Sequence, residues 1–131
     1  EGVDHPTAAV NIAALIETAA AKPGARILNS ADPDAPNALE ISRAIAAHLR
    51  HTWEEVLVDD DSPGAHPWDK RPPVILDTNA ALELGYEPVG DYATTVVEEV
   101  DWLVNERPAL NDGLFGDYLD YGAEDRFLDN R

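Results

Sequence analysis

The sequence predicts an α/β fold that is dominated by helices and has a few short strands. Two patterns indicate this class. Apolar residues recur at helical spacing in several segments, most regularly over residues 38–49 and 92–105. Short apolar runs bounded by Pro, Gly, Asn or Asp lie between those segments and are typical of buried strands. With 131 residues, 44% of them hydrophobic and 27% charged, the chain has the composition of one globular domain.

The chain begins with a predicted helix and strand. Residues 6–21 are rich in Ala, and their larger apolar side chains spread around the helix, so we expect burial on most faces. A Pro-Gly pair ends this helix. Residues 26–31 follow as a short strand. Because Ile27 and Leu28 are adjacent, they point to opposite faces of the strand, and we expect both to be buried.

A capping box is predicted at the start of the next helix, which covers residues 38–49. The side chain of Asn37 can accept a hydrogen bond from the backbone of Glu40, whose carboxylate can reach back to Asn37. Ile41 and Ile45 lie on the apolar stripe of this helix. We therefore expect an amphipathic helix with a fixed first turn.

The remaining elements are shorter, apart from the last helix. Residues 56–58 are predicted to form a second strand, and residues 74–76 form another brief apolar run. Asp77 then begins a short helix that a glycine ends. Asp91 is the predicted cap of the last clear helix, which covers residues 92–105.

The long loop of residues 59–73 is the segment most typical of a functional site, because loops of more than about a dozen residues are usually functional or disordered. Within it, His66, Trp68 and Arg71 offer an imidazole, an indole and a guanidinium, a mixture that suits a polar substrate. The alternative is that Trp68 only anchors the loop while Arg71 is solvated. Asn29 is a fourth candidate: we expect it to be partly buried, where its amide either ties the following loop or faces a ligand.

The chain carries no self-contained catalytic or cofactor motif. It has no glycine-rich phosphate loop, no G-x-S-x-G, no H-E-x-x-H, and no Tyr with a Lys four residues later. The acidic residues 59–61 with His66 could gather a cation, but they lack the spacing of a calcium loop, so a solvated loop is favoured. We therefore predict no catalytic, cofactor-binding or metal-binding residue in this chain.

Charge and composition exclude several classes of partner. The net charge of −17 repels the phosphate backbone of nucleic acids, so nucleic acid is excluded as a partner. No apolar run approaches the roughly 20 residues of a membrane span. There is no Cys, and nothing else points to an oxidising compartment, so a cytoplasmic protein is expected.

Several motifs occur in an informative order. His5 precedes the first helix, ILNSAD ends the first strand, and LEISRAIAAHL carries Glu40 and Ile45. The most specific motif is LDTNAALELGYEP at residues 76–88, and DYATTVVEEVDWL follows at residues 91–103.

This order resembles the carboxy-terminal, substrate-binding portion of the extended short-chain dehydrogenase/reductase family, the NAD-dependent epimerases and dehydratases. The corresponding family patterns are H-V-D-D-V-A, Y-N-V-G, E-x-x-x-x-I and D-x-S-K-A-x-x-x-L-G-W-x-P. The resemblance covers about residues 5–105. It implies that residues 1–107 are the substrate-binding part of an NAD(P)-binding Rossmann-type enzyme, an epimerase, dehydratase or reductase acting on a sugar or another polar small molecule.

The resemblance also implies which parts lie elsewhere. NAD or NADP and the catalytic Tyr and Lys would belong to an amino-terminal cofactor domain that precedes Glu1, an expectation that the absence of Met favours. Residues 108–131 are then an acidic, aromatic tail that packs on the same domain or on a partner. The alternative is a stand-alone acidic α/β interaction module without catalytic activity. A severed domain, unlike such a module, is expected to expose a large apolar patch or to form a homo-oligomer.

Overall fold

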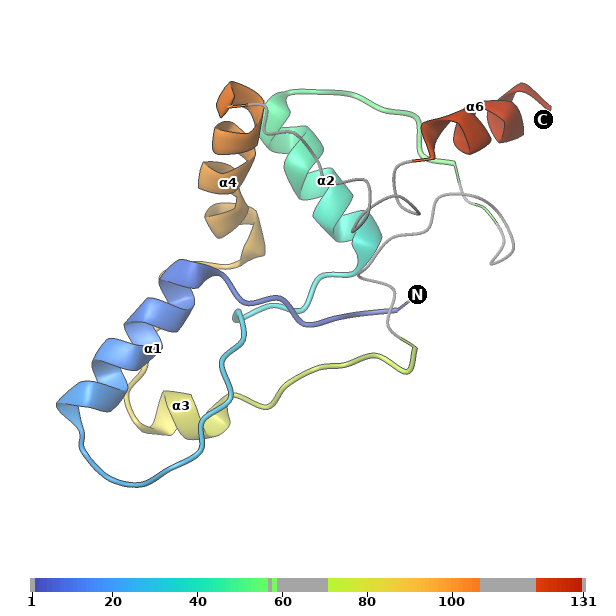
Figure 1. Cartoon of the computed structure of the whole chain (residues 1–131). Helices are drawn as coiled ribbons and strands as arrows, with labels where there is room; N and C mark the ends of the chain where they lie inside the picture. Colours follow the sequence, from blue (N-terminus) through green and yellow to red (C-terminus); the bar gives the residue numbers. More distant parts are fainter. Residues whose placement is uncertain (1, 57, 59–70, 107–119, 131) are drawn as a thin grey trace.

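The computed structural model describes residues 2–56, 58, 71–106 and 120–130, and helices dominate this part of the chain (Figure 1). Its helices are α1 (Ala9–Ala21), α2 (Ala38–Leu49), α3 (Asn79–Glu83), α4 (Tyr92–Glu106) and α6 (Tyr121–Asp129). Among the described residues, β pairing is limited to one parallel bridge between Asp4 and Val74. No helix in this part of the chain is long and apolar enough to cross a membrane.

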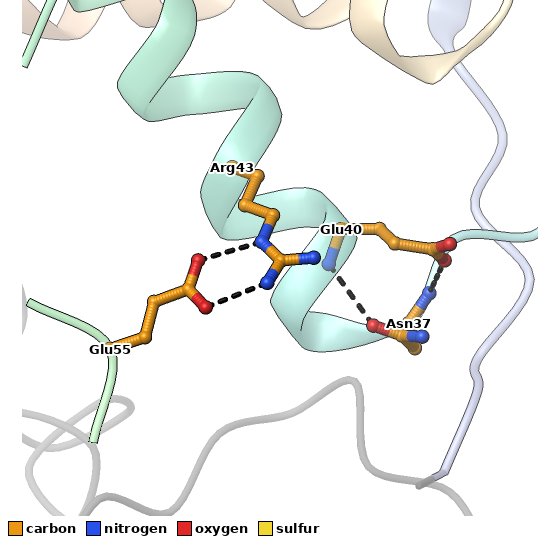
Figure 2. A network of polar contacts seen from close by, with 4 residues as sticks. All are labelled: Asn37, Glu40, Arg43 and Glu55. Atoms are coloured by element: carbon orange, nitrogen blue, oxygen red, sulfur yellow. Dashed lines mark hydrogen bonds and ion pairs between the residues drawn. The ribbon is translucent and has the colours of Figure 1, made fainter. Parts of the chain in front are cut away.

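The predicted capping box at the start of α2 is confirmed (Figure 2). The Oδ1 atom of Asn37 accepts a hydrogen bond from the Glu40 backbone N–H at 3.0 Å. The Glu40 carboxylate accepts one in return from the Asn37 backbone N–H at 2.9 Å. Two of the N–H groups that a helix start leaves unpaired are thereby satisfied.

Helices α2 and α4 pack against each other, and they stand side by side in Figure 1. Each contributes a buried apolar side chain, Ile41 on α2 and Val100 on α4. Polar contact adds a second link between them, because Nε2 of His48 lies 2.6 Å from Oδ1 of Asp101.

A separate small core joins α1 to α3. Its buried members are Leu15, Ala81 and Tyr86, and Leu28 packs against them. Gly85 ends the α3 region with a φ of 92°, a backbone conformation that side chains other than glycine's rarely adopt. The glycine therefore lets the chain turn so that Tyr86 enters the core.

The predicted strand at residues 26–31 is wrong, because this segment has no regular secondary structure. Leu28 packs on the core, but Ile27 is 94% exposed, so only one of the two expected faces is covered. A strand requires the backbone of a neighbour to pair with, and the described residues supply none here. Residues 74–76 and the described part of residues 56–58 form no strand either, beyond the single bridge.

The expected burial of the first helix on most faces is also wrong. Helix α1 buries Leu15 and Asn11, whereas Val10, Ile12 and Ile16 are exposed. Among the described residues, Leu28, Ala81 and Tyr86 pack around Leu15, and Asn11 bonds to Asp32 and to the backbone of residues 89–90. The other apolar side chains of α1 therefore remain in contact with solvent.

The tail contains a helix that the sequence did not predict. Helix α6 begins after Asp120, whose side chain accepts a hydrogen bond from the Ala123 backbone N–H at 3.0 Å. This helix buries none of its residues and leaves Tyr121 and Leu128 exposed. The expectation that residues 108–131 pack on this domain or on a partner therefore stays a prediction.

Candidate functional site

The loop that precedes α2, with the sequence ADPDAPN, brings the starts of three helices together. Oδ1 of Asp32 accepts a hydrogen bond at 2.8 Å from the Ala8 backbone, at the residue before α1. Oδ1 of Asp34 accepts one at 2.8 Å from the backbone N–H of Tyr92, the first residue of α4. Asn37 caps α2 itself. Negative and acceptor groups are favourable at helix N-termini, so one short loop orients three helices.

A buried pair, Asn11 and Asp32, forms the centre of this junction, with 0% and 2% of their surfaces exposed. Nδ2 of Asn11 donates to Oδ1 of Asp32 at 2.7 Å and to the carbonyl oxygen of Gly90 at 2.9 Å. Oδ1 of Asn11 accepts from the Val89 backbone N–H at 2.8 Å. A buried carboxylate is costly unless it is hydrogen-bonded, so the amide of Asn11 and the Ala8 N–H together reduce the cost of burying Asp32.

Three buried oxygens near this core have no hydrogen-bond partner among the described residues: Oδ2 of Asp32, the Tyr86 hydroxyl and the Ser30 hydroxyl. Buried polar atoms are nearly always paired in native proteins, so each one calls for a physical explanation. Burial, and to a smaller extent the Asp32 carboxylate, raises the pKa of Tyr86 above its ordinary value. Tyr86 is therefore a neutral phenol at physiological pH.

His5 uses both ring nitrogens to hold backbone in place. Its Nε2 lies 2.9 Å from the carbonyl oxygen of Asp32, and its Nδ1 accepts from the backbone N–H of Leu76 at 3.0 Å. Because Nδ1 accepts from Leu76, the ring hydrogen that reaches the Asp32 carbonyl oxygen is the one on Nε2. The imidazole therefore links the segment before α1 to two other segments instead of offering a free base.

A cleft of about 490 Å³ lies between the start of α1 and one face of α4. Its lining includes the carboxylates of Asp32, Glu98 and Glu99 and the aromatic side chains of Tyr92 and Trp102. Burial raises the pKa of Tyr92, and the charges of Glu99 and then Asp32 raise it further. The phenol of Tyr92 thus lies in the field of two of the cleft's carboxylates, and the described residues that line the cleft include no Lys, Arg or His.

Two of the four predicted substrate residues lie in the part of the chain that the structure describes. His66 and Trp68, like the acidic residues 59–61, lie outside the described residues. Arg71 is described and exposed. Asn29 is exposed too, so its expected partial burial is wrong; its Nδ2 donates to the carbonyl oxygen of Asp77 at 2.9 Å. The amide therefore links residues 26–31 to the residues just before α3. It does not tie down the loop of residues 32–37 that follows its own segment.

Sequence reasoning missed the residues that build the junction, namely Asn11, Asp32 and Asp34. A signal for each is visible in retrospect. Asn11 is the lone amide in an Ala-rich apolar helix, and a polar side chain there is expected to have a buried partner. The two aspartates sit in a D-P-D stretch directly before a helix. Neither signal identifies the partner, because the partners are far away in the sequence.

No family model, curated protein or solved structure matches this chain in comparisons with known proteins. The resemblance to the extended short-chain dehydrogenase/reductase family therefore stays a prediction that rests on the motifs quoted above.

Proposed function

We propose that this chain is the substrate-binding part of an NAD(P)-dependent epimerase, dehydratase or reductase that acts on a sugar or another polar small molecule. The observation that carries the proposal is the exposure of apolar side chains on two segments that, among the described residues, have no β pairing beyond the single bridge at Val74. Ile27 is 94% exposed and Ile75 is 63% exposed, and the Asn29 to Asp77 hydrogen bond joins the segments that carry them. Soluble monomers rarely leave much apolar surface uncovered, which supports a place within a larger enzyme.

The most specific of the motifs adds support. In the LGYEP motif Gly85 adopts its positive φ, and Tyr86 is buried beside Ala81 of the same stretch. These residues have structural roles, because the glycine allows the turn and the tyrosine fills the core. The motif therefore belongs to a packing unit, and substrate contact is assigned to the loop that precedes it.

The proposal assigns cofactor binding and substrate binding to two different parts of one enzyme. A cofactor domain outside these residues would hold NAD or NADP and supply the reacting Tyr and Lys. This chain would supply substrate contacts from His66, Trp68, Arg71 and Asn29, an aromatic surface with donors suited to oxygen atoms. Its role is binding and orientation, and it performs no chemical step alone.

The first test compares the 131-residue chain with the complete translation product of its gene. We expect the complete product to bind NAD or NADP saturably, as measured by calorimetry, and the 131-residue chain to bind neither at millimolar concentration, because it has no phosphate-binding glycine loop. Tight binding of a dinucleotide by the 131-residue chain, or none by the complete product, would overturn the proposal.

The second test uses steady-state kinetics of the complete enzyme. Arg71→Ala and Trp68→Ala are expected to raise KM while kcat and dinucleotide affinity stay near their original values, since contacts made equally in the ground and transition states act on KM. Arg26→Ala removes an exposed guanidinium outside the loop and is the matched control. Unchanged KM with a large loss of stability would show that Trp68 anchors the loop instead.

The interaction module is the second candidate, and α6 is the observation that favours it. This helix exposes Tyr121 and Leu128, a pattern suited to docking on another protein. A complete translation product without dinucleotide affinity would favour this candidate over the enzyme.

A further inference from the structure

The imidazole of His5 is shared by three segments that lie outside the helices. It belongs to the segment before α1, and its Nε2 donates to the carbonyl oxygen of Asp32, in the loop before α2, at 2.9 Å. Its Nδ1 accepts from the backbone N–H of Leu76, in the segment before α3, at 3.0 Å. The first and third segments also pair through backbone hydrogen bonds of Val74. One side chain therefore holds two other segments against the one that leads into α1.

The two hydrogen bonds of His5 respond in opposite ways to a second proton on the ring. In the neutral ring, Nδ1 carries a lone pair and accepts the Leu76 N–H. A proton on Nδ1 makes this nitrogen a donor, so two N–H groups would face each other across 3.0 Å. The Nε2–H keeps its acceptor, the Asp32 carbonyl oxygen, and a charged donor strengthens that bond. Protonation therefore breaks the link to Leu76 and keeps the link to Asp32.

The charged side chains on these segments do not cause the break. Next to the contacts of His5, the described residues carry the carboxylates of Asp4, Asp32 and Asp77, and the guanidinium of Arg71 begins the third segment. Carboxylates outnumber cations here, so nearby charge does not expel an imidazolium. The repulsion comes from the backbone N–H alone. The ring is half-buried and its bond to that N–H is exposed, so a proton can reach it from solvent without unfolding of the domain.

We propose that His5 forms a pH-dependent link, and that protonation of its ring in mildly acidic solution releases the Leu76 N–H while the domain stays folded. Histidine is the side chain that ordinarily changes charge roughly between pH 5 and 8. The link is present with the neutral ring and is lost as the pH falls. Val74 and Asp77 keep their own backbone contacts, so the change is confined to the residues around Leu76. The inference rests on hydrogen bonds alone and does not depend on the enzymatic function proposed above.

The test is an NMR titration of the 131-residue chain over that pH range. The ring protons of His5 and the backbone N–H of Leu76 are expected to shift with the same midpoint. Relative to an unstructured peptide at the same pH, the Leu76 N–H is expected to lose about threefold to tenfold of its protection from hydrogen exchange, the effect of one hydrogen bond. The Val74 N–H, which donates to the Val3 carbonyl oxygen at 2.8 Å, is the internal control and is expected to keep its protection.

Two substitutions of His5 separate its two hydrogen bonds. The amide nitrogen in His5→Gln can replace Nε2 as the donor to the Asp32 carbonyl oxygen, but nothing replaces Nδ1. We expect low protection of the Leu76 N–H at every pH. The side-chain oxygen in His5→Asn can replace Nδ1 as an acceptor, so we expect protection of the Leu76 N–H that no longer falls in acid. His51→Gln changes an exposed histidine in another segment, and this control is expected to keep the pH response of the unaltered chain.

Three results would overturn the inference. Titration of the His5 ring without a matching change at Leu76 would show that the imidazole does not hold this N–H. A Leu76 response that persists in His5→Gln would assign the pH dependence to another group. A ring that stays neutral until the whole chain unfolds would leave no pH-dependent link in the folded protein. The comparison of His5 with Leu76 in the unaltered chain needs no variant, so it decides the question even where a substitution prevents folding. None of these results bears on dinucleotide binding by the complete product, so the two proposals fail separately.

Discussion

Two pairs of an asparagine and an acid hold this protein together in different ways. Asn37 and Glu40 form a cap on the exposed first turn of α2, three residues apart (Figure 2). Asn11 and Asp32 lie 21 residues apart and are buried where α1 meets the loop before α2. The functional groups are similar in both pairs, but one pair orders a single helix turn while the other joins segments distant in the sequence.

The comparison shows that burial changes how much similar hydrogen bonds contribute to stability. At the surface, water competes for the hydrogen bonds, so their net contribution is small. In the interior, removing one partner leaves the other buried without a hydrogen bond, and the folded state loses stability by the whole desolvation cost of that group. The buried pair should therefore dominate stability, although the exposed pair has the more recognisable sequence pattern.

The largest expected effect is that of Asn11→Ala. The substitution removes the hydrogen bonds to Asp32, Val89 and Gly90 and leaves the Asp32 carboxylate buried with one fewer donor. We expect the free energy of unfolding to fall by about 3 kcal/mol, because the substitution removes a hydrogen bond to a buried carboxylate and leaves buried backbone groups without partners. Urea denaturation followed by circular dichroism measures the change.

Asn29→Ala is the matched control for that experiment, because Asn29 is exposed and makes one hydrogen bond, to the Asp77 carbonyl. It should lower the free energy of unfolding by about 1 kcal/mol or less. Similar losses for both variants would show that burial of the Asn11 and Asp32 pair is not what matters.

Asn37→Ala has the next largest effect. Loss of the side-chain acceptor for the Glu40 N–H is expected to lower the free energy of unfolding by about 1 kcal/mol, the usual contribution of such a cap. Glu40→Gln keeps an acceptor for the Asn37 N–H and should cost less. A midpoint of denaturation that does not move in Asn37→Ala would contradict the role of the cap.

These two pairs also show how far the sequence could predict this protein. The start of α2 and its cap at Asn37 were predictable because their determinants lie within a few residues. The first helix begins at Ala9, three residues later than expected, and the start of α6 was not predicted. The strand at residues 26–31 was not, because its formation depends on a neighbouring backbone that periodicity cannot reveal. The roles of Asp32 and Asn11 escaped prediction for the same reason, since their partners come from other segments. Of the predicted substrate residues, only Arg71 and Asn29 lie where the structure describes them.

A third prediction sharpens the comparison within the buried region, where not every polar atom is satisfied. The Tyr86 hydroxyl is buried without a partner among the described residues, so Tyr86→Phe removes a desolvation cost while keeping the ring in the core. We expect a gain of up to about 1 kcal/mol in the free energy of unfolding at neutral pH, in contrast to the loss in Asn11→Ala.

The same variant has a pH signature. Burial raises the pKa of Tyr86 above its ordinary value of 10.0, so the neutral phenol is favoured in the folded state. Its contribution is complete below that ordinary value and is lost as the pH rises through the folded-state value. Tyr86→Phe should therefore weaken the decline of stability in alkaline solution, as measured by urea midpoints over the alkaline range. A steeper alkaline decline, or a loss at neutral pH, would mean that the hydroxyl has a partner.

The smallest expected effect is that of Arg43 and Glu55, and this pair separates burial from sequence distance. The two residues are twelve positions apart, and the guanidinium contacts both carboxylate oxygens at 2.6 Å (Figure 2). The hydrogen bond from Arg43 lowers the pKa of Glu55 below its ordinary value of 4.5, although both side chains are exposed.

A lowered carboxyl pKa stabilises the folded state above the unfolded-state pKa, and this contribution is lost as the pH falls through the folded-state value. Arg43→Met should therefore return the Glu55 pKa toward 4.5 in an NMR titration, with only a slight fall in the urea midpoint at neutral pH that added salt makes smaller still. If Arg43→Met cost as much stability as Asn11→Ala, the distance between partners along the chain, and not their burial, would decide which contacts hold this protein together.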